Sequence, residues 1–112
     1  MNTDTIAQAI HESIRAHATS HAGEHINDAL DSVRVHCVAY KGGIYTEVVL
    51  LARIGEPHPL RFDGVAKRRL PASSVKAALL DACREAGRQG VFVSAKSDWE
   101  QRINDIFEGV KQ

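Results

Sequence analysis

The sequence predicts an α+β domain with helices at the N-terminus, an antiparallel sheet of two to three strands built on a Gly-Gly hairpin, then a helix, a short strand and a C-terminal helix. Two observations support this order. Hydrophobic residues recur every three to four positions near both ends of the chain, which is typical of helices with one buried face. Between them the period changes to two on each side of Gly42-Gly43, which is typical of two strands joined by a tight turn.

The N-terminal region contains two hydrophobic sets that one straight helix cannot bury together. The first set shares one helix face and consists of Ile6, Ile10 and Ile14. At about 100° per residue, the second set lies roughly on the opposite side of a continued helix. This second set is Ile26, Leu30 and Val33. We therefore expect the helix to break within residues 19–23, which include a glycine, and a second helix to follow.

The predicted hairpin occupies the middle of the chain. Side chains alternate in character over Val33–Tyr40, so this segment is expected to be a half-buried strand. Gly42 and Gly43 supply the two positive φ angles that a two-residue hairpin turn requires. The second strand, expected at 44–54, is hydrophobic on both sides over Val48–Leu51. This pattern indicates a central strand covered on both faces or a contact between two copies of the chain.

Three further elements are expected after the hairpin. A third, shorter strand over Leu60–Val65 follows a turn at 55–59, where two prolines remove backbone donors. A helix begins near Pro71 and stops at Gly87 and Gly90. Its hydrophobic face consists of Val75, Leu79, Ala82, Cys83 and Ala86.

The C-terminal segment is expected to hold a short strand and a last helix. The strand is predicted at Val91–Val93 because three hydrophobic residues follow each other there. Ser97 and Glu100 have the spacing of a capping box at the start of the helix. The hydrophobic face of this helix consists of Trp99, Ile103, Ile106, Phe107 and Val110.

Length and composition limit the class of protein. The chain has 112 residues, with 14 basic and 14 acidic side chains and 44% hydrophobic residues, so we expect one folded domain spanning 1–112. No segment approaches the roughly 18 hydrophobic residues of a membrane span, and the N-terminus lacks a signal pattern. A cytoplasmic protein without membrane contact is expected. Cys37 and Cys83 lie in hydrophobic patterns and are expected to be buried thiols.

No arrangement of residues typical of a catalytic site is found, so the leading hypothesis is a non-catalytic interaction protein that needs no cofactor. The charges are segregated, with five acidic residues against one basic residue in 1–31 and seven basic against three acidic in 32–70. We expect the hairpin and the last helix to contact a partner protein, with a second copy of this chain as one candidate. The contacting residues would be Tyr45, Val49, Leu51 and Trp99.

An alternative hypothesis is nucleic-acid binding by the basic region at 61–76. The cations that would contact phosphates are Arg61, Lys67, Arg68, Arg69 and Lys76. The aromatic residues that could stack on bases are Tyr40, Tyr45 and Phe62.

Part of the chain loosely resembles double-stranded RNA-binding domains. The resemblance rests on Tyr45, the loop from Gly55 to Phe62 and the basic step into a helix rich in Ser, Lys and Ala, which follow the family's strand-strand-strand-helix order. It covers under half of the chain and implies RNA contact by the basic residues before that helix. The chain departs from the family pattern where the segment from Phe62 to Pro71 is too short for another hairpin strand, and where Pro71 interrupts the basic helix start.

A second alternative is metal binding by the histidine-rich N-terminal segment. His17, His21 and His25 are four residues apart and would share a helix face with Glu24, a ligand set suited to Zn²⁺ or Ni²⁺. The order His-x-x-Glu-His over 21–25 also matches a peptidase motif. A peptidase is not expected, because a third ligand and a substrate cleft are missing from the pattern and a glycine interrupts it.

Overall fold

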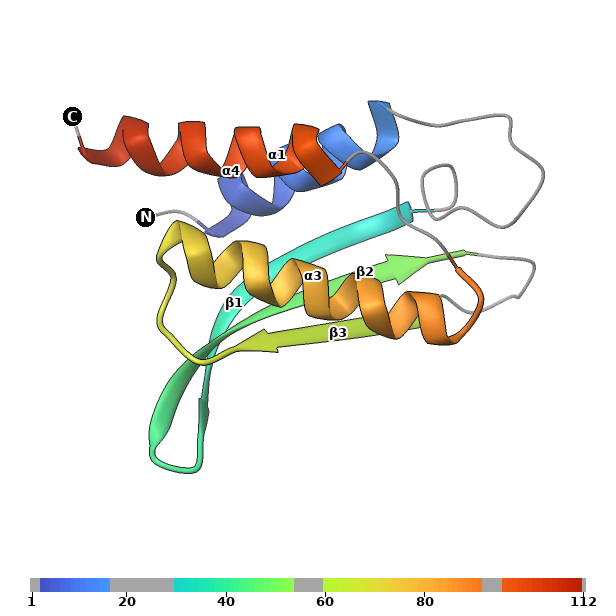
Figure 1. Ribbon diagram of the computed structural model, residues 1–112, viewed down its shortest axis with the longest axis horizontal. Coiled ribbons are helices and arrows are strands. Elements are labelled where there is room, and N and C mark those ends of the chain that lie inside the picture. Colours follow the sequence, from blue (N-terminus) through green and yellow to red (C-terminus); the bar gives the residue numbers. More distant parts are fainter. Residues whose placement is uncertain (1–2, 17–29, 54–59, 92–95, 112) are drawn as a thin grey trace.

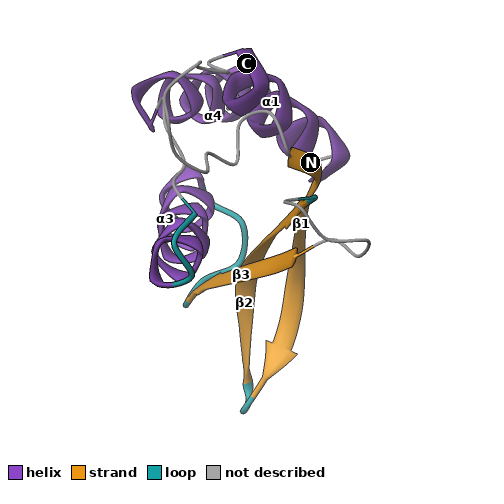
Figure 2. Ribbon diagram, turned by 90° about the vertical axis from the view of Figure 1, so that its right-hand side faces the viewer, coloured by secondary structure: helices purple, strands orange, loops and turns teal. Residues whose placement is uncertain are grey.

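The computed structural model describes residues 3–16, 30–53, 60–91 and 96–111, and it has the predicted α+β class. The elements in chain order are α1 (Thr3–Ala16), β1 (Leu30–Tyr40), β2 (Gly43–Ala52), β3 (Leu60–Ala66), α3 (Ala72–Arg88) and α4 (Lys96–Lys111). The strands form one antiparallel sheet in the order β1-β2-β3, so β2 is the central strand, as its hydrophobic sequence predicts. The helices lie on one side of this sheet (Figures 1 and 2).

The β1-β2 hairpin is confirmed, but its turn lies one residue earlier than expected. Tyr40 pairs with Gly43, so the two turn residues are Lys41 and Gly42, with φ angles of 46° and 80°. Positive φ at both central residues is the geometry that matches the right-handed twist of the two strands. Gly43 is therefore the first residue of β2, and Lys41 adopts the left-handed conformation that glycine was expected to supply.

The core lies between the sheet and the helices. Side chains of β1 and β2 that face the helices include Val33, Val35, Val48 and Leu50, all buried. The isoleucine stripe of α1 is confirmed, because Ile6, Ile10 and Ile14 are fully buried. The helix α1 lies over β1 and beside α4, while α3 lies over β2 and β3. The predicted faces of the last two helices also enter the core, through Val75, Leu79, Ala82 and Ala86 of α3 and Trp99, Ile103 and Phe107 of α4.

The expected second N-terminal helix is wrong where the structure describes it, because Leu30 and Val33 belong to β1. Their spacing of three resembles a helical period, but it has another cause. The pairing with β2 shifts between Leu30 and Ser32, where one extra residue is inserted into β1. Such a bulge reverses the alternation of faces, so Leu30 and Val33 both face the helices. Ile26 and the predicted break at 19–23 lie outside the described residues.

The third strand and the last two helices are confirmed with small shifts at their ends, whereas the predicted strand at 91–93 is wrong at Val91. The third strand is confirmed and extends to Ala66, and α4 begins at Lys96, one residue before the expected cap. Pro71 precedes α3, which continues through Gly87 and ends at Arg88, and the positive φ of 82° falls on Gly90. Val91 is buried outside any strand, and the rest of the predicted strand at 91–93 lies outside the described residues.

The helix α3 contacts the backbone of β3 directly at Gly64. A Cβ atom at this position would lie 1.9 Å from the carbonyl oxygen of Ala78 and 2.3 Å from the backbone nitrogen of Ala82. Small residues on the facing side of α3 allow this approach. The Asp81 carboxylate of α3 also accepts a hydrogen bond from the backbone N–H of Val65, at 3.1 Å. No helix in the described part of the chain is long and hydrophobic enough to cross a bilayer.

Cys83 on α3 gives a pH-dependent prediction. Burial raises the pKa of the Cys83 thiol to about 11, because an apolar surrounding disfavours the thiolate. The folded chain holds the thiol proton of Cys83 more tightly than the unfolded chain does. The contribution of this group to the free energy of unfolding is therefore fully present at neutral pH and is lost as pH rises from about 9 through 11. In a Cys37→Ser variant, alkylation of Cys83 by iodoacetamide at pH 8 should be at least about tenfold slower in the folded than in the urea-unfolded protein. Equal rates would contradict the shift.

Candidate binding surface at the hairpin end

The face of the sheet that points away from the helices is not covered by any described helix (Figure 2). We call it the open face. Residues on it alternate with the buried ones, and the strand register aligns them in rows across the sheet. Counted from the hairpin turn, the first row contains Tyr40 and the second contains Val38 and Tyr45. The third row contains His36, Glu47 and Val65, and the fourth contains Arg34, Val49 and Asp63. The open face is therefore hydrophobic and aromatic near the hairpin turn and charged further along the strands.

A shallow hollow of about 540 Å³ lies on the open face near the hairpin turn. Its lining consists of Val38, Ala39, Tyr40, Tyr45, Glu47, Val65 and Lys67, and we call it the hairpin-end surface. Tyr40 is 58% exposed and Val65 is 44% exposed, although both are large hydrophobic residues. The hairpin extends past the helices here (Figure 1), so no described helix covers these side chains. Exposed apolar side chains gathered around a hollow are typical of a binding surface.

Two tyrosine rings and a cation lie together at this surface. The rings of Tyr40 and Tyr45 meet edge to face, with centroids 6.0 Å apart and an interplanar angle of 78°. The ammonium group of Lys41 lies 5.4 Å from the centroid of the Tyr40 ring. The register of the hairpin brings the two rings together, because Tyr45 pairs with Val38 and Tyr40 pairs with Gly43, one row nearer the turn on the same face.

A basic turn leads from β3 into α3 beside the same surface. We use this name for residues 67–70, which include the exposed side chains of Lys67, Arg68 and Arg69. None of these three side chains forms an ion pair with another described residue. Lys67 also lines the hairpin-end surface. The basic turn therefore presents three cations without ion pairs to described residues, the first of them at the hollow that the two tyrosines line.

The basic turn is held by the buried side chain of Thr46 in β2. The Thr46 hydroxyl donates a hydrogen bond to the carbonyl oxygen of Arg68, at 2.6 Å, and accepts one from the backbone N–H of Leu70, at 2.8 Å. Leu70 has a φ of 34°, a conformation that costs energy for a residue with a side chain. Both hydrogen bonds stabilise this strained turn. The central strand therefore determines where the cations of the turn lie.

The other two cations of the predicted nucleic-acid site have partners within the chain. Arg61 donates to Asp63 at 2.8 Å on the open face, and this contact raises the pKa of Arg61. Lys76 on α3 donates to the Asn104 side chain of α4 at 3.0 Å and is partly buried. Phe62, one of the aromatic candidates, is fully buried in the core. The structure thus brings Lys67 to the hollow with Tyr40 and Tyr45, and Arg68 and Arg69 follow Lys67 in the basic turn. Arg61, Lys76 and Phe62 do not line this hollow.

The four residues predicted for protein contact do not form one surface. Tyr45 lies at the hairpin-end surface and Leu51 is half-buried at the other end of the open face. Val49 faces the same side but is only 2% exposed in the single chain, between Arg34 and Asp63 in the register. Trp99 is buried in the core with α1 and α4, so it is not accessible to a partner. The hydrophobic character of β2 on both sides is therefore satisfied within one chain.

One acidic side chain lies within the hairpin-end surface. Glu47 is mostly buried, and its carboxylate oxygen Oε1 lies 2.5 Å from Nε2 of His36 on the neighbouring strand. This cross-strand pair marks the boundary between the aromatic end and the charged end of the open face.

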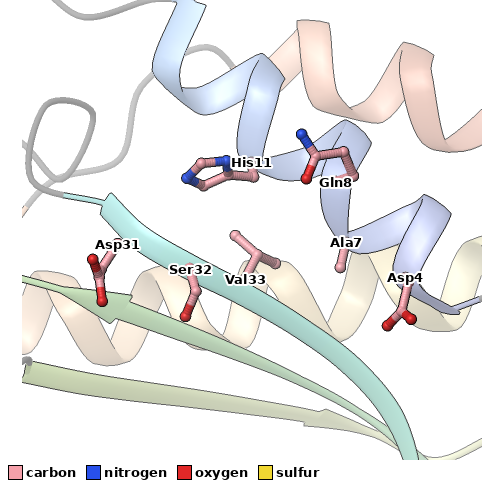
Figure 3. Close-up of a pocket in the computed structure, with 7 residues that line it drawn as sticks. All are labelled: Asp4, Ala7, Gln8, His11, Asp31, Ser32 and Val33. Atoms are coloured by element: carbon pink, nitrogen blue, oxygen red, sulfur yellow. The ribbon is translucent and has the colours of Figure 1, made fainter.

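A second, polar hollow of about 260 Å³ lies between α1 and the start of β1 (Figure 3). It is lined by Asp4, Gln8 and His11 from the helix and by Asp31 and Ser32 from the strand. Nε2 of His11 is buried and has no hydrogen-bond partner within the part of the chain that the structure describes. Among the described residues, no three His, Cys, Asp or Glu side chains come close enough to hold a metal ion. The predicted ligands His17, His21, Glu24 and His25 lie outside the described residues.

No protein-family model, curated protein or solved structure matches the chain. The strand-strand-strand-helix order of the resemblance to double-stranded RNA-binding domains is present, with Leu60–Ala66 as the third strand and α3 as the helix. The expectation that the segment after Phe62 is too short for a further hairpin strand is wrong, because the third strand begins before Phe62 and includes it. As expected, Pro71 keeps the basic turn outside the helix.

Four residues of the hairpin-end surface were not candidate site residues in the sequence analysis, namely Val38, Ala39, Glu47 and Val65, and neither was Lys41 next to this surface. Lys41 belongs to the turn only because the turn is shifted by one residue from Gly42-Gly43. Val65 reaches the tyrosines only through the pairing of β3 with β2, which places it beside Glu47. The alternation of β3 gave a signal for Val65, since Phe62 and Val65 have opposite parity and cannot both face the helices.

Proposed function

We propose that the protein is a non-catalytic nucleic-acid-binding protein that uses the basic turn and the hairpin-end surface. The single observation that carries the proposal is the position of Lys67 at the hollow with Tyr40 and Tyr45, followed in the basic turn by Arg68 and Arg69, none of the three cations having an ion pair with another described residue. Cations supply the phosphate contacts that dominate affinity for nucleic acids, and aromatic rings add base contacts. The backbone of the turn is held by Thr46, so the segment that carries these cations is ordered before any ligand binds.

The test is the binding of a labelled oligonucleotide, measured by fluorescence anisotropy over a series of salt concentrations. If about three phosphates are contacted, the logarithm of the binding constant should fall against the logarithm of salt concentration with a slope of about −2 to −3. The double variant Arg68→Glu/Arg69→Glu should lose at least about tenfold in affinity at low salt and show a shallower slope.

A matched control is the double variant Arg84→Glu/Arg88→Glu. It makes the same change in net charge with exposed arginines at the far end of α3 (Figure 1). This control should bind as the unmodified protein does. Absence of binding at low salt, or equal losses in the two double variants, would refute a specific role for the basic turn.

A second candidate function, contact with a partner protein or a second copy, is supported by Ile44. Ile44 is 47% exposed near the hairpin turn, on the other side of the hairpin from Tyr45. Ile44 does not lie on the open face, so nucleic-acid binding there does not explain why this hydrophobic side chain is exposed. A hairpin with hydrophobic residues on both sides is suited to insertion into a partner surface.

Sedimentation velocity over a range of micromolar concentrations tests this second candidate. Self-association that is lost in an Ile44→Ser variant would support a second copy as the partner. A monomer at every concentration, with no protein recovered by affinity purification from the source cells, would remove the support for it.

A further inference from the structure

We propose that the hairpin-end surface binds single-stranded nucleic acid, with unpaired bases stacked on Tyr40 and Tyr45 and the backbone running along the basic turn. This inference rests on the proposed function and adds to it the class of nucleic acid. It is carried by the position of the two rings, which lie on an open sheet face and not at the end of a helix. Aromatic rings on an open face are suited to unstacked bases, because every base has a face that can stack.

The exposed ring of Tyr40, beside the half-buried ring of Tyr45, leaves room for a ligand base. Tyr40 is 58% exposed, and the Tyr45 ring meets it edge to face, so the pair does not stack its two faces on each other. Val38 and Val65 complete an apolar floor beside the rings. In a duplex, the bases are stacked on each other and their faces are not accessible to side chains. Contact with these rings therefore requires bases that are unpaired.

The charges around the hollow separate a base position from a phosphate position. The Glu47 carboxylate lies at the hollow and would repel a phosphate there, but it can accept a hydrogen bond from a base amino group. Positive charge lies at both sides of the hollow, with Lys41 at the Tyr40 ring and Lys67, followed by Arg68 and Arg69, at the basic turn. A strand that crosses from Lys41 to the basic turn would place its bases over the tyrosines and its phosphates near the cations.

The test compares a labelled single-stranded oligonucleotide of about 12 nucleotides and mixed sequence with the same sequence as a duplex. RNA and DNA forms of the single strand are both measured, since the stacking and phosphate chemistry is common to them. We expect the single strand of at least one form to bind at least about tenfold more tightly than the duplex. Tyr40→Leu and Tyr45→Leu should each weaken single-strand binding by about tenfold, and Tyr40→Phe should leave it unchanged.

The outcomes separate this inference from the proposed function. Equal binding of duplex and single strand, with no effect of the tyrosine variants but a loss in Arg68→Glu/Arg69→Glu, would overturn the single-strand inference and keep nucleic-acid binding. No binding of any oligonucleotide by the unmodified protein would overturn both.

Thermal unfolding of Tyr40→Leu and Tyr45→Leu is the control for fold, and a variant that has lost its cooperative transition is replaced by Tyr40→Ser or Tyr45→Ser. If the folded tyrosine variants lose self-association and keep full oligonucleotide affinity, the surface is a protein interface and the inference is wrong.

Discussion

Replacing Gly64 by alanine is expected to destabilise the protein by about 3 kcal/mol or more. The added Cβ would meet two backbone atoms of α3, the carbonyl oxygen of Ala78 at 1.9 Å and the nitrogen of Ala82 at 2.3 Å. Backbone atoms cannot rotate away as a side chain can, so the whole helix must move from the sheet. Because α3 covers both β2 and β3, that movement opens the core. A loss of this size is a large part of the total stability of a small domain.

Urea unfolding followed by circular dichroism measures this effect. The matched control is Gly87→Ala, where the new Cβ would have no atom within 4 Å and the residue lies inside α3. The control should be stabilising by roughly 0.5 to 1 kcal/mol, because alanine favours the helix. A Gly64→Ala protein as stable as the unmodified one would show that α3 does not lie against the β3 backbone.

The second large effect is expected at Thr46. A Thr46→Val variant keeps the shape of the side chain but loses both hydrogen bonds to the basic turn. The N–H of Leu70 then lacks its acceptor, and we expect a loss of about 2 kcal/mol in unfolding free energy. The strained φ of 34° at Leu70 would no longer be held, so the basic turn should change its conformation. Oligonucleotide affinity should fall together with stability.

Thr46→Ser is the control that separates the hydroxyl from the methyl group. It retains both hydrogen bonds and removes only the methyl group, so the expected loss is about 1 kcal/mol with oligonucleotide binding unchanged. Unfolding in urea and anisotropy measured on the same two variants check the prediction. If Thr46→Val binds as tightly as Thr46→Ser, the basic turn does not depend on the hydroxyl.

The fold could be predicted where hydrophobic spacing and secondary structure agree. The isoleucines of α1 and the alternation after Val33 have the periods of their elements, and the structure confirms both. The prediction failed at Leu30, because the bulge in β1 gives a strand the three-residue spacing of a helix. It shifted by one residue at the turn, because Lys41 adopts a conformation that sequence reasoning reserves for glycine. Both failures are local departures from ideal geometry.

The candidate site was harder to predict because it depends on contacts between strands. Lys67, Arg68 and Arg69 are adjacent in sequence and were recognised together. Arg61 is paired with Asp63, and Lys76 donates a hydrogen bond to Asn104. These contacts depend on side-chain geometry, which residue types do not reveal. Tyr45 and Lys67 line the same hollow because of the register in which β2 pairs with β3. Sequence patterns indicate which side chains share a face, but not which strands are neighbours.

The two anchors of the segment between β3 and α3 have a kinetic consequence. The Thr46 hydroxyl is hydrogen-bonded to the backbone of the basic turn. The close contact of Gly64 with the backbone of α3 holds β3 and α3, the two elements that the turn joins, against each other. The backbone of the basic turn therefore needs no ordering step when a ligand arrives, and the conformational entropy lost there on association is mainly that of the exposed side chains. Encounter with an anionic ligand should then be limited by diffusion and electrostatic steering, so that raising the ionic strength slows association far more than it speeds dissociation.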